Sequence, residues 1–273
     1  RAYFESIAMT NFSTIQLEKD SRGVATLWLN RADKHNAFNA EMIAELIQAL
    51  RQVAADDSLR FLILRGRGKH FSAGADLAWM QASAALDYAT NLRDAHELGE
   101  LMNQLYHLPC PTLAVVQGAA FGGAVGLTAC CDIAIGACEA SFSLSEVRIG
   151  LAPAVISPYL VQAIGERAAR RYALSAERFS GERARELGLL AECYPAAELE
   201  SEVEQWVATL LLNSPQAMRE TKALLHGVGS GVLSDALRQR TESVIAGIRI
   251  SEEGQEGLNA FLHKRTPAWQ AQS

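Results

Sequence analysis

The sequence predicts an α/β protein with a parallel core and a helical C-terminal section. Up to about residue 160, short apolar runs alternate with amphipathic helical segments, a pattern typical of parallel strands joined by crossover helices. After Leu160 almost every segment has helical spacing. The length of 273 residues allows one large domain or two smaller ones, and 49% hydrophobic residues indicate a packed core rather than a disordered, collagen-like or coiled-coil chain.

The alternation begins with apolar runs at residues 24–29 and 61–65, which read as buried strands. Between them apolar residues recur at helical spacing, and Asn39 is placed to cap that helix. The apolar residues of this helix are Met42, Ile43, Leu46, Ile47, Leu50 and Val53. We then expect a helix around 94–105, a strand over 112–117, a helix over 122–131 and a strand over 133–136.

The C-terminal section is predicted to contain a series of helices. A helical stripe lies on Leu199, Val203, Trp206, Val207, Leu210 and Leu211. Pro215 opens a second helix, and residues 233–249 and 252–262 form two more. We expect a leader at 1–8 that is an expression remnant preceding Met9. It is followed by a catalytic core over 9–205 and a helical region over 206–273. The helical region is expected to need partner subunits to bury its apolar stripes.

Charge and cysteine content exclude several classes of function. With 25 Lys and Arg against 31 Asp and Glu, the net charge of -6 argues against a nucleic-acid partner held by bulk positive charge. Neither a zinc-like His/Cys spacing nor an apolar stretch of about 20 residues occurs, so we expect no metal and no membrane contact. An odd number of cysteines predicts buried free thiols in the reducing cytoplasm: Cys110, Cys130, Cys131, Cys138 and Cys193.

A glycine-rich turn at residues 118–126 (GAAFGGAVG) follows a predicted strand and opens an apolar helix. Its glycines permit backbone N–H groups to approach a ligand closely. Gly122, Gly123 and Gly126 do not have the spacing of a dinucleotide fingerprint, and the Gly-Lys-Ser/Thr of a phosphate loop is absent. Close packing of a helix on a sheet is the alternative explanation for these glycines.

A second turn, residues 71–80 (FSAGADLAWM), has the same strand–turn–helix arrangement. Asp76 suits the first turn of the new helix, which is also compatible with an ordinary helix cap. Two helix N-termini with free N–H groups could converge on one oxygen and form an oxyanion hole.

A series of motifs gives the chain a family resemblance. FSAGADL and QGAAFGG lie about 45 residues apart, preceded by NRADKHNAFN and followed by CDIAIG and FSLSEVRIGLAP. In their order along the chain, over residues 12–269, these motifs resemble those of the crotonase (enoyl-CoA hydratase/isomerase) superfamily. GGAVGLTACCDIAIG, LSEVRIGLAPAVISPY and EGLNAFLHKRTPAW most resemble the bacterial 3-methylglutaconyl-CoA and isohexenylglutaconyl-CoA hydratases.

The resemblance implies the crotonase (ClpP-like) fold, in which ββα units form a spiral superhelix and C-terminal helices build a homotrimer or a hexamer of two trimers. It also implies an acyl-CoA substrate, with coenzyme A as part of the substrate and no tightly bound cofactor. Backbone N–H groups of Ala75 and Gly123 would hold the thioester oxygen, on which an enolate charge develops, and Glu146 would transfer the proton. The family's second glutamate corresponds to Gly126 here, so Glu146 would act as both acid and base or share the work with another group.

The roles of further residues are implied by the family resemblance alone. The CoA moiety would lie near Lys34, His35, Ala37, Ala73, Asp76, Leu77, Phe261 and Lys264, with Lys34 offering a point charge for phosphate. The acyl pocket would involve Trp79, Met80, Phe121 and Gly126, with Tyr88, Leu92, Leu98 and Met102 in a flexible helical region. Alternatives are a surface pair between Glu146 and Arg148, and helix packing with a solvated lysine at Phe261 and Lys264.

The leading functional prediction is hydration of a 3-branched glutaconyl-CoA, with a methyl or isohexenyl branch, in leucine/isovalerate or acyclic terpene catabolism. A Δ3,Δ2-enoyl-CoA isomerase with the same residues is the main alternative. A thioester hydrolase or decarboxylase of the superfamily, and a non-catalytic CoA- or RNA-binding member, remain open. The acidic net charge argues against the RNA-binding alternative.

Overall fold

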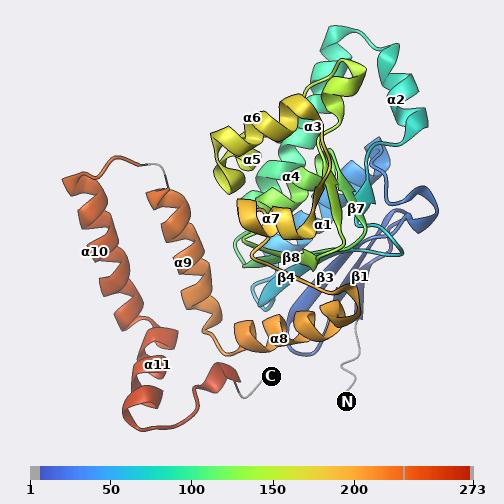
Figure 1. Ribbon diagram of the computed structural model, residues 1–273. Helices are drawn as coiled ribbons and strands as arrows, with labels where there is room; N and C mark the ends of the chain where they lie inside the picture. The colour runs from blue at the N-terminus through green and yellow to red at the C-terminus, as the bar shows by residue number, and fades with distance from the viewer. Residues whose placement is uncertain (1–6, 230, 271–273) are drawn as a thin grey trace. The chain divides into compact units, whose positions relative to one another are not determined.

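The computed structural model describes residues 7–229 and 231–270, which form two compact units (Figure 1). Unit 1 contains the described chain up to Leu108 together with Thr112–Glu202, and unit 2 contains Pro109–Pro111 and the described chain from Val203 onward. The predicted boundary between residues 205 and 206 falls inside the helix α8 (Leu199–Leu211), three residues after this division.

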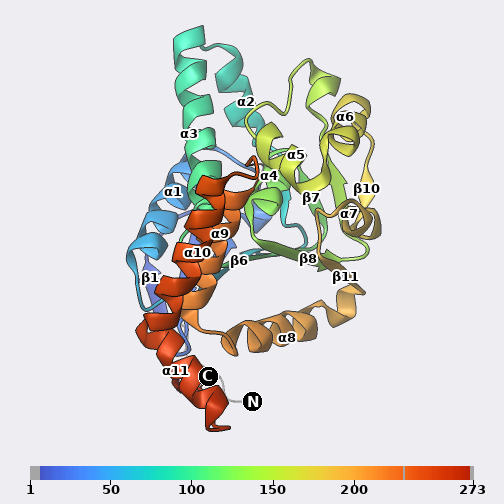
Figure 2. The same cartoon turned by 90° about the vertical axis from the view of Figure 1, so that its left-hand side faces the viewer.

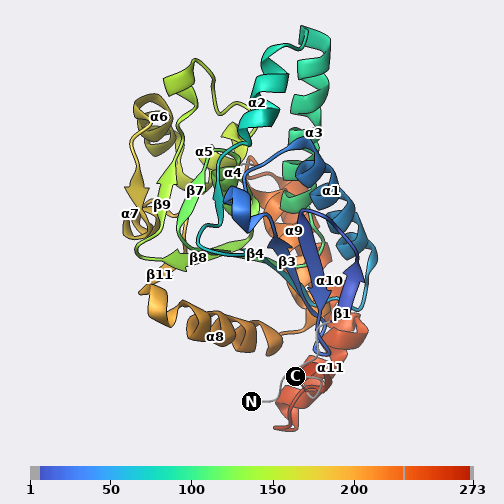
Figure 3. The same cartoon turned by 90° about the vertical axis from the view of Figure 1, so that its right-hand side faces the viewer.

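Unit 1 is built on a seven-stranded sheet in the order β1-β2-β3-β4-β6-β8-β11. β3, β4 and β8 of this sheet are labelled in Figure 3, where β3 and β4 are neighbours and β6 lies between β4 and β8. β1, β2 and β3 pair antiparallel, whereas β3, β4, β6, β8 and β11 pair parallel. The prediction of a parallel core is therefore confirmed. The bounds are β1 Ile7–Thr10, β2 Ile15–Lys19, β3 Val24–Leu29, β4 Phe61–Gly66, β6 Thr112–Val116, β8 Ile133–Ala137 and β11 Glu192–Tyr194.

A smaller sheet has the order β10-β9-β7-β5, in which β5, β7 and β9 are parallel and β10 is antiparallel. Its strands are β5 Ser72–Ala73, β7 Ala119–Phe121, β9 Ser141–Ser143 and β10 Phe179–Ser180. This sheet was not predicted, because strands of two or three residues carry no readable alternation. Almost every segment after Leu160 was expected to be helical, and the strands β10 and β11 are the exceptions that the sequence pattern did not indicate.

The helices of unit 1 begin close to the predicted positions. α1 (Ala40–Ala55) is capped as expected, since the Asn39 side chain accepts a hydrogen bond from the Met42 N–H. α3 (Tyr88–Tyr106) begins six residues before the predicted start because Asp87 caps it. α4 lies beside β7 and α5 in Figure 2. The bounds of the others are α2 Leu77–Ala84, α4 Gly123–Cys130, α5 Ser157–Ile164, α6 Glu166–Ser175 and α7 Gly181–Leu187.

Unit 2 consists of helices, as predicted. After α8 come α9 (Pro215–Val228), α10 (Asp235–Ile250) and α11 (Glu252–Leu262). Ser214 caps α9 and also donates to the Glu253 carboxylate, which ties α9 to α11. Large apolar side chains remain exposed on this unit, including Val232, Leu233, Ile250, Phe261 and Leu262.

The predicted burial of the cysteines is confirmed for three of the five residues. Cys110, Cys130 and Cys131 are buried, whereas Cys138, directly after β8, and Cys193, within β11, are partly exposed. Among the described residues, no group of three or more His, Cys, Asp or Glu could hold a metal ion. The structure describes no helix with the length and apolar character needed to cross a membrane. Of the predicted leader, residues 1–6 lie outside the described residues, and Ile7 and Ala8 pair in β1.

Candidate active site

Three predicted site residues follow three adjacent parallel strands of the small sheet. Ala73 at the end of β5 pairs with Phe121 at the end of β7, and Phe121 pairs with Ser143 at the end of β9. Ala75 and Gly123 each lie two residues beyond these ends, and Glu146 lies three residues beyond. Because the carboxyl ends of parallel strands share one edge, the sheet brings all three to the same edge, where ligands of α/β folds commonly bind.

Phe38 connects the two predicted oxyanion donors. It forms an isolated parallel bridge with Ala75, in which its N–H donates to the Gly74 carbonyl (2.9 Å) and its carbonyl accepts from the Asp76 N–H (2.8 Å). Its ring lies 2.6 Å from the point that a Cβ on Gly123 would occupy. One buried residue therefore contacts both turns, the first through its backbone and the second through its ring. The bridge leaves the N–H of Ala75 free to point away from Phe38. In the part of the chain that the structure describes, neither Ala75 nor Gly123 donates a backbone hydrogen bond.

The turn before α4 requires glycine. Gly122 has φ +59° and ψ -119°, a conformation that residues with a Cβ rarely adopt. Its N–H donates to the Ser143 carbonyl at 2.9 Å, which holds the start of α4 against the end of β9. Gly123 then begins the helix, so its N–H lies at the positive end of the helix dipole.

The turn before α2 is held by a charged pair. Asp76 is the N-cap of α2 rather than a residue of its first turn, and its carboxylate accepts from the Trp79 N–H at 3.1 Å. Arg31 Nη2 donates to the other carboxylate oxygen at 3.0 Å. The hydrogen bond from Arg31, followed by that from Trp79, lowers the pKa of Asp76. The carboxylate therefore positions the turn that presents Ala75.

Glu146 begins a short 3-10 helix, η2 (Glu146–Ile149), and is half-buried. Its Oε1 lies 3.2 Å from the point that a Cβ on Gly122 would occupy. Its Oε2 is fully buried and has no hydrogen-bond partner among the described residues. Burial raises the pKa of this carboxyl group. The described part of the chain contains no ion pair between Glu146 and Arg148, so the surface-pair alternative is not supported.

Gly126 lies in the first turn of α4, four residues after the N-cap Gly122. A Cβ at this position would overlap the Ile156 Cγ2 methyl and lie 2.9 Å from Ile156 Cβ and 3.1 Å from Met102 Cε. Both covering side chains are buried. The space for a second carboxylate is thus filled by apolar groups. Ile156 has no periodic signal in the sequence and was missed, whereas Met102 was expected near the acyl pocket.

The structure brings part of the predicted CoA set to the 71–76 turn. His35 accepts the Ala73 N–H at its carbonyl (3.0 Å), and Lys34 and His35 are exposed beside the buried Ala37. His70, which was not predicted, packs edge-on against His35 with ring centroids 5.0 Å apart. Burial, followed by the charge of His35, lowers the pKa of His70.

The remaining predicted residues are placed as follows. Trp79 and Met80 lie on α2 and are partly exposed, and Leu77 begins α2 with a side chain outside the described residues. Phe121 ends β7, where the Arg178 guanidinium lies 5.0 Å from its ring centroid. Phe261 and Lys264 are exposed at and just after the end of α11 in unit 2.

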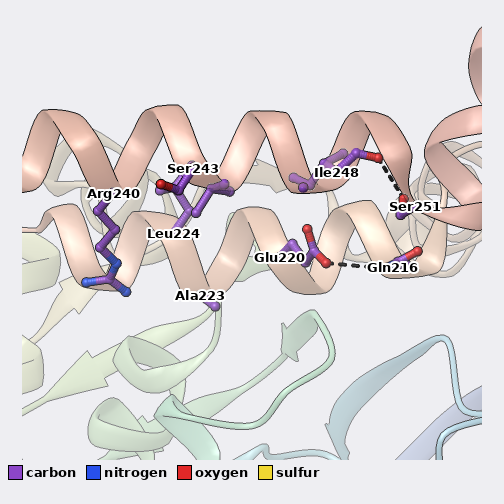
Figure 4. Close-up of a pocket in the computed structure, with 10 residues that line it drawn as sticks. Gln216, Glu220, Ala223, Leu224, Arg240, Ser243, Ile248 and Ser251 are labelled. Carbon is purple, nitrogen blue, oxygen red and sulfur yellow. Dashed lines mark hydrogen bonds between the residues drawn. The ribbon is translucent and has the colours of Figure 1, made fainter.

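A cavity of about 390 Å³ lies in unit 2 between α9 and α10 (Figure 4). Polar side chains at its rim include Gln216, Glu220, Arg240 and Ser251. No residue that the sequence analysis assigned to catalysis or CoA binding lines this cavity, so it is separate from the predicted site.

The chain belongs to the enoyl-CoA hydratase/isomerase family, whose model matches residues 19–272. It is 35% identical over 255 residues to a putative enoyl-CoA hydratase of Thermus thermophilus, covering 93% of this chain and 99% of that protein. It is 30% identical over 245 residues to the 2,3-dehydroadipyl-CoA hydratase of Escherichia coli, covering 89% and 94%. A crystal structure of an enoyl-CoA hydratase from Shewanella pealeana matches with a TM-score of 0.91 and 48% identity, covering 95% and 97%. The chain is therefore an enzyme of the crotonase superfamily, which confirms the resemblance at that level.

Proposed function

We propose that the protein is a hydro-lyase that adds water across the α,β double bond of an enoyl-CoA thioester. The observation that carries this proposal is the half-buried Glu146 carboxyl group, whose Oε2 has no described partner, beside two turns with unused N–H groups at Ala75 and Gly123. Attack on the β carbon places negative charge on the thioester oxygen as an enolate. Two fixed N–H donors stabilise that charge, each by about 2.7–4 kcal/mol in acyl-transfer enzymes.

In this proposal Glu146 transfers both protons. Its carboxylate takes a proton from the water that attacks the β carbon, and its carboxylic acid then gives a proton to the α carbon. Burial raises the pKa of the carboxyl group, which brings its acid and base forms closer together in energy near neutral pH. Since Ile156 and Met102 fill the space over Gly126, no second carboxylate enters this scheme.

For the substrate we propose a 3-branched glutaconyl-CoA with a methyl or isohexenyl branch, in leucine/isovalerate or acyclic terpene catabolism. The apolar cover of Ile156 and Met102 suits an apolar branch near the β carbon. The distal carboxylate of a glutaconyl group could orient the attacking water. The E. coli relative at 30% identity is named for a substrate, 2,3-dehydroadipyl-CoA, that also carries a distal carboxylate.

The remaining assignments belong to the same proposal. The CoA moiety contacts Lys34, His35, Ala37, Ala73, Asp76, Leu77, Phe261 and Lys264, and the acyl group contacts Trp79, Met80 and Phe121. No other cofactor is tightly bound, and the enzyme is cytoplasmic and forms a homotrimer or a hexamer. The exposed apolar residues of unit 2, such as Ile250 and Phe261, support subunit contacts.

A Δ3,Δ2-enoyl-CoA isomerase is the second candidate. The closed space at Gly126 favours it, because moving a double bond needs one base to carry a proton between two carbons and needs no activated water. The two candidates differ in whether solvent oxygen enters the product.

Purified protein incubated with crotonyl-, 3-methylglutaconyl- and isohexenylglutaconyl-CoA in ¹⁸O-labelled water tests reaction type and substrate together. We expect mass spectrometry to find one labelled water added to a branched glutaconyl-CoA. A product of unchanged mass with a shifted double bond would support the isomerase instead. Release of free CoA or carbon dioxide would indicate a hydrolase or decarboxylase, and no product from any substrate would contradict catalysis of these reactions.

A further inference from the structure

Two cysteines of unit 1 lie next to each other outside the residues assigned to the reaction. Cys193 is in β11 and pairs in register with Gly136 of the parallel neighbour β8, and Cys138 directly follows β8. The Cys138 N–H donates to the Tyr194 carbonyl at 2.8 Å, which continues the ladder. Backbone pairing therefore fixes both cysteines on adjacent strands.

The two side chains point at each other. The Cys138 thiol donates to the Cys193 sulfur with 2.7 Å between the Sγ atoms. Cys138 and Cys193 are partly exposed, whereas Cys110, Cys130 and Cys131 are buried. A small reagent in solution can thus reach this pair while the other three thiols are protected.

The surroundings of Cys138 hold the proton on its thiol. Burial and the hydrogen bond to Cys193 raise the pKa of Cys138 to about 12, and Glu182 and Glu139 add to this effect. The Arg185 guanidinium, whose pKa is raised chiefly by Glu192, also interacts with both thiols. Cys138 therefore keeps its proton, so we assign the first attack on a reagent to its neighbour Cys193, which lies within hydrogen-bonding distance.

We propose that Cys138 and Cys193 are a reactive dithiol that closes to a disulfide by exchange with a low-molecular-weight disulfide. The Cys193 thiolate attacks the reagent's S–S bond, forms a mixed disulfide and releases one thiol. Cys138 loses its proton and attacks the Cys193 sulfur, which releases the second thiol. Two protein thiols are oxidised to one disulfide, and one reagent disulfide is reduced to two thiols.

The bridge would have a defined structural effect. It ties β11, at the edge of the seven-stranded sheet, to β8 through residues 55 positions apart. The enclosed segment contains β9, Glu146 and the helices α5 to α7. Closing a loop of this length restricts the unfolded chain, so the bridged protein should melt at a higher temperature than the reduced protein.

Mass spectrometry tests the bond itself. The native protein is equilibrated with 2-hydroxyethyl disulfide, a neutral reagent chosen because Glu139 and Glu182 lie near Cys138, and is then denatured and alkylated. We expect three of the five cysteines to be alkylated, a linked peptide pair containing Cys138 and Cys193, and recovery of all five thiols after reduction with dithiothreitol. Five alkylated cysteines, or a bridge that includes Cys110, Cys130 or Cys131, would overturn the proposal.

Single variants test the order of the two steps. Cys138→Ser should accumulate a stable hydroxyethyl adduct on Cys193, and Cys193→Ser should form an adduct on Cys138 at least about tenfold more slowly. The opposite order of rates would overturn the assignment of Cys193 as the attacking thiolate.

Thermal unfolding tests whether the disulfide fits the native structure without strain. Oxidised wild type should melt at least about 4 °C above the reduced protein, whereas Cys193→Ser should show no shift with the same reagent. An unchanged or lower melting temperature for fully bridged protein would show that the bond strains the fold, contrary to the proposal.

Discussion

Gly122, the N-cap of α4, and Gly126, in the first turn of α4, are four residues apart, yet they face side chains of opposite chemistry. The Glu146 carboxylate lies over Gly122, whereas the Ile156 and Met102 side chains lie over Gly126. Glycine is needed at Gly122 for its backbone conformation and at Gly126 for close packing. The N-terminus of α4 therefore offers a polar turn at Gly122 suited to proton transfer and an apolar turn at Gly126 suited to an acyl chain.

The largest expected effect comes from removing the carboxylate on the polar turn. Glu146→Gln keeps the shape of the side chain but cannot exchange a proton, so kcat should fall by about 10²–10⁴-fold. The measurement is steady-state kinetics with the substrate that the labelled-water experiment identifies. Circular dichroism should show an unchanged fold, and turnover within about twofold of wild type would remove Glu146 from the mechanism.

The next effect tests whether the apolar turn excludes a second carboxylate. Gly126→Glu would force a side chain into Ile156 and bury an unpaired charge, which should lower the free energy of unfolding by at least about 3 kcal/mol. Urea denaturation measures this loss. Ile156→Ala in the same chain should recover part of the loss because it removes the overlapping methyl group.

Gly99 on α3 provides the matched control for this test. A Cβ there would lie 3.8 Å from Val155 Cγ1, which is ordinary contact. Gly99→Ala should therefore stabilise the helix by about 0.5–1 kcal/mol, whereas Gly126→Ala should destabilise the protein despite the same gain in helix propensity. Equal effects at the two glycines would contradict the close packing at Gly126.

A smaller effect is expected at Gly122. In Gly122→Ala the backbone must keep φ near +59° with a Cβ 3.2 Å from Glu146 Oε1. We expect a loss of about 1–3 kcal/mol in the free energy of unfolding from backbone strain, and a lower kcat because both Glu146 and the Gly123 N–H are displaced. If kcat stays at the wild-type value while stability falls, the turn supports the fold but does not position the catalytic groups.

The sequence predicted the long elements and the site residues for different physical reasons. The strands β3, β4, β6 and β8 are short apolar runs, the helix α1 has clear helical periodicity, and Asn39 caps α1 as its residue type suggests. Ala75, Gly123 and Glu146 were assigned by family resemblance, and the small sheet that brings them to one edge was missed because its strands are two or three residues long. Ile156 over Gly126 depends on tertiary packing alone, which no local pattern records.

The last and smallest effect concerns stability against pH. Burial raises the pKa of Glu146 above its ordinary value of 4.5, so the folded protein binds this proton more tightly than the unfolded chain does. The stability that this group contributes is therefore fully present below pH 4.5 and is lost as the pH rises through the folded-state pKa. Above that pKa, burying the carboxylate charge destabilises the wild-type protein.

Glu146→Gln removes this titration, so its melting temperature relative to wild type should increase as the pH rises above 4.5 and become constant above the folded-state pKa. Differential scanning calorimetry across this range measures the difference. A difference in melting temperature that does not change with pH would mean that burial does not raise the pKa of Glu146. The proposal that this one carboxyl group acts as both base and acid would then lose the support of a raised pKa. A difference that grows with pH, together with lost turnover, would show that the carboxylate lowers stability while serving catalysis.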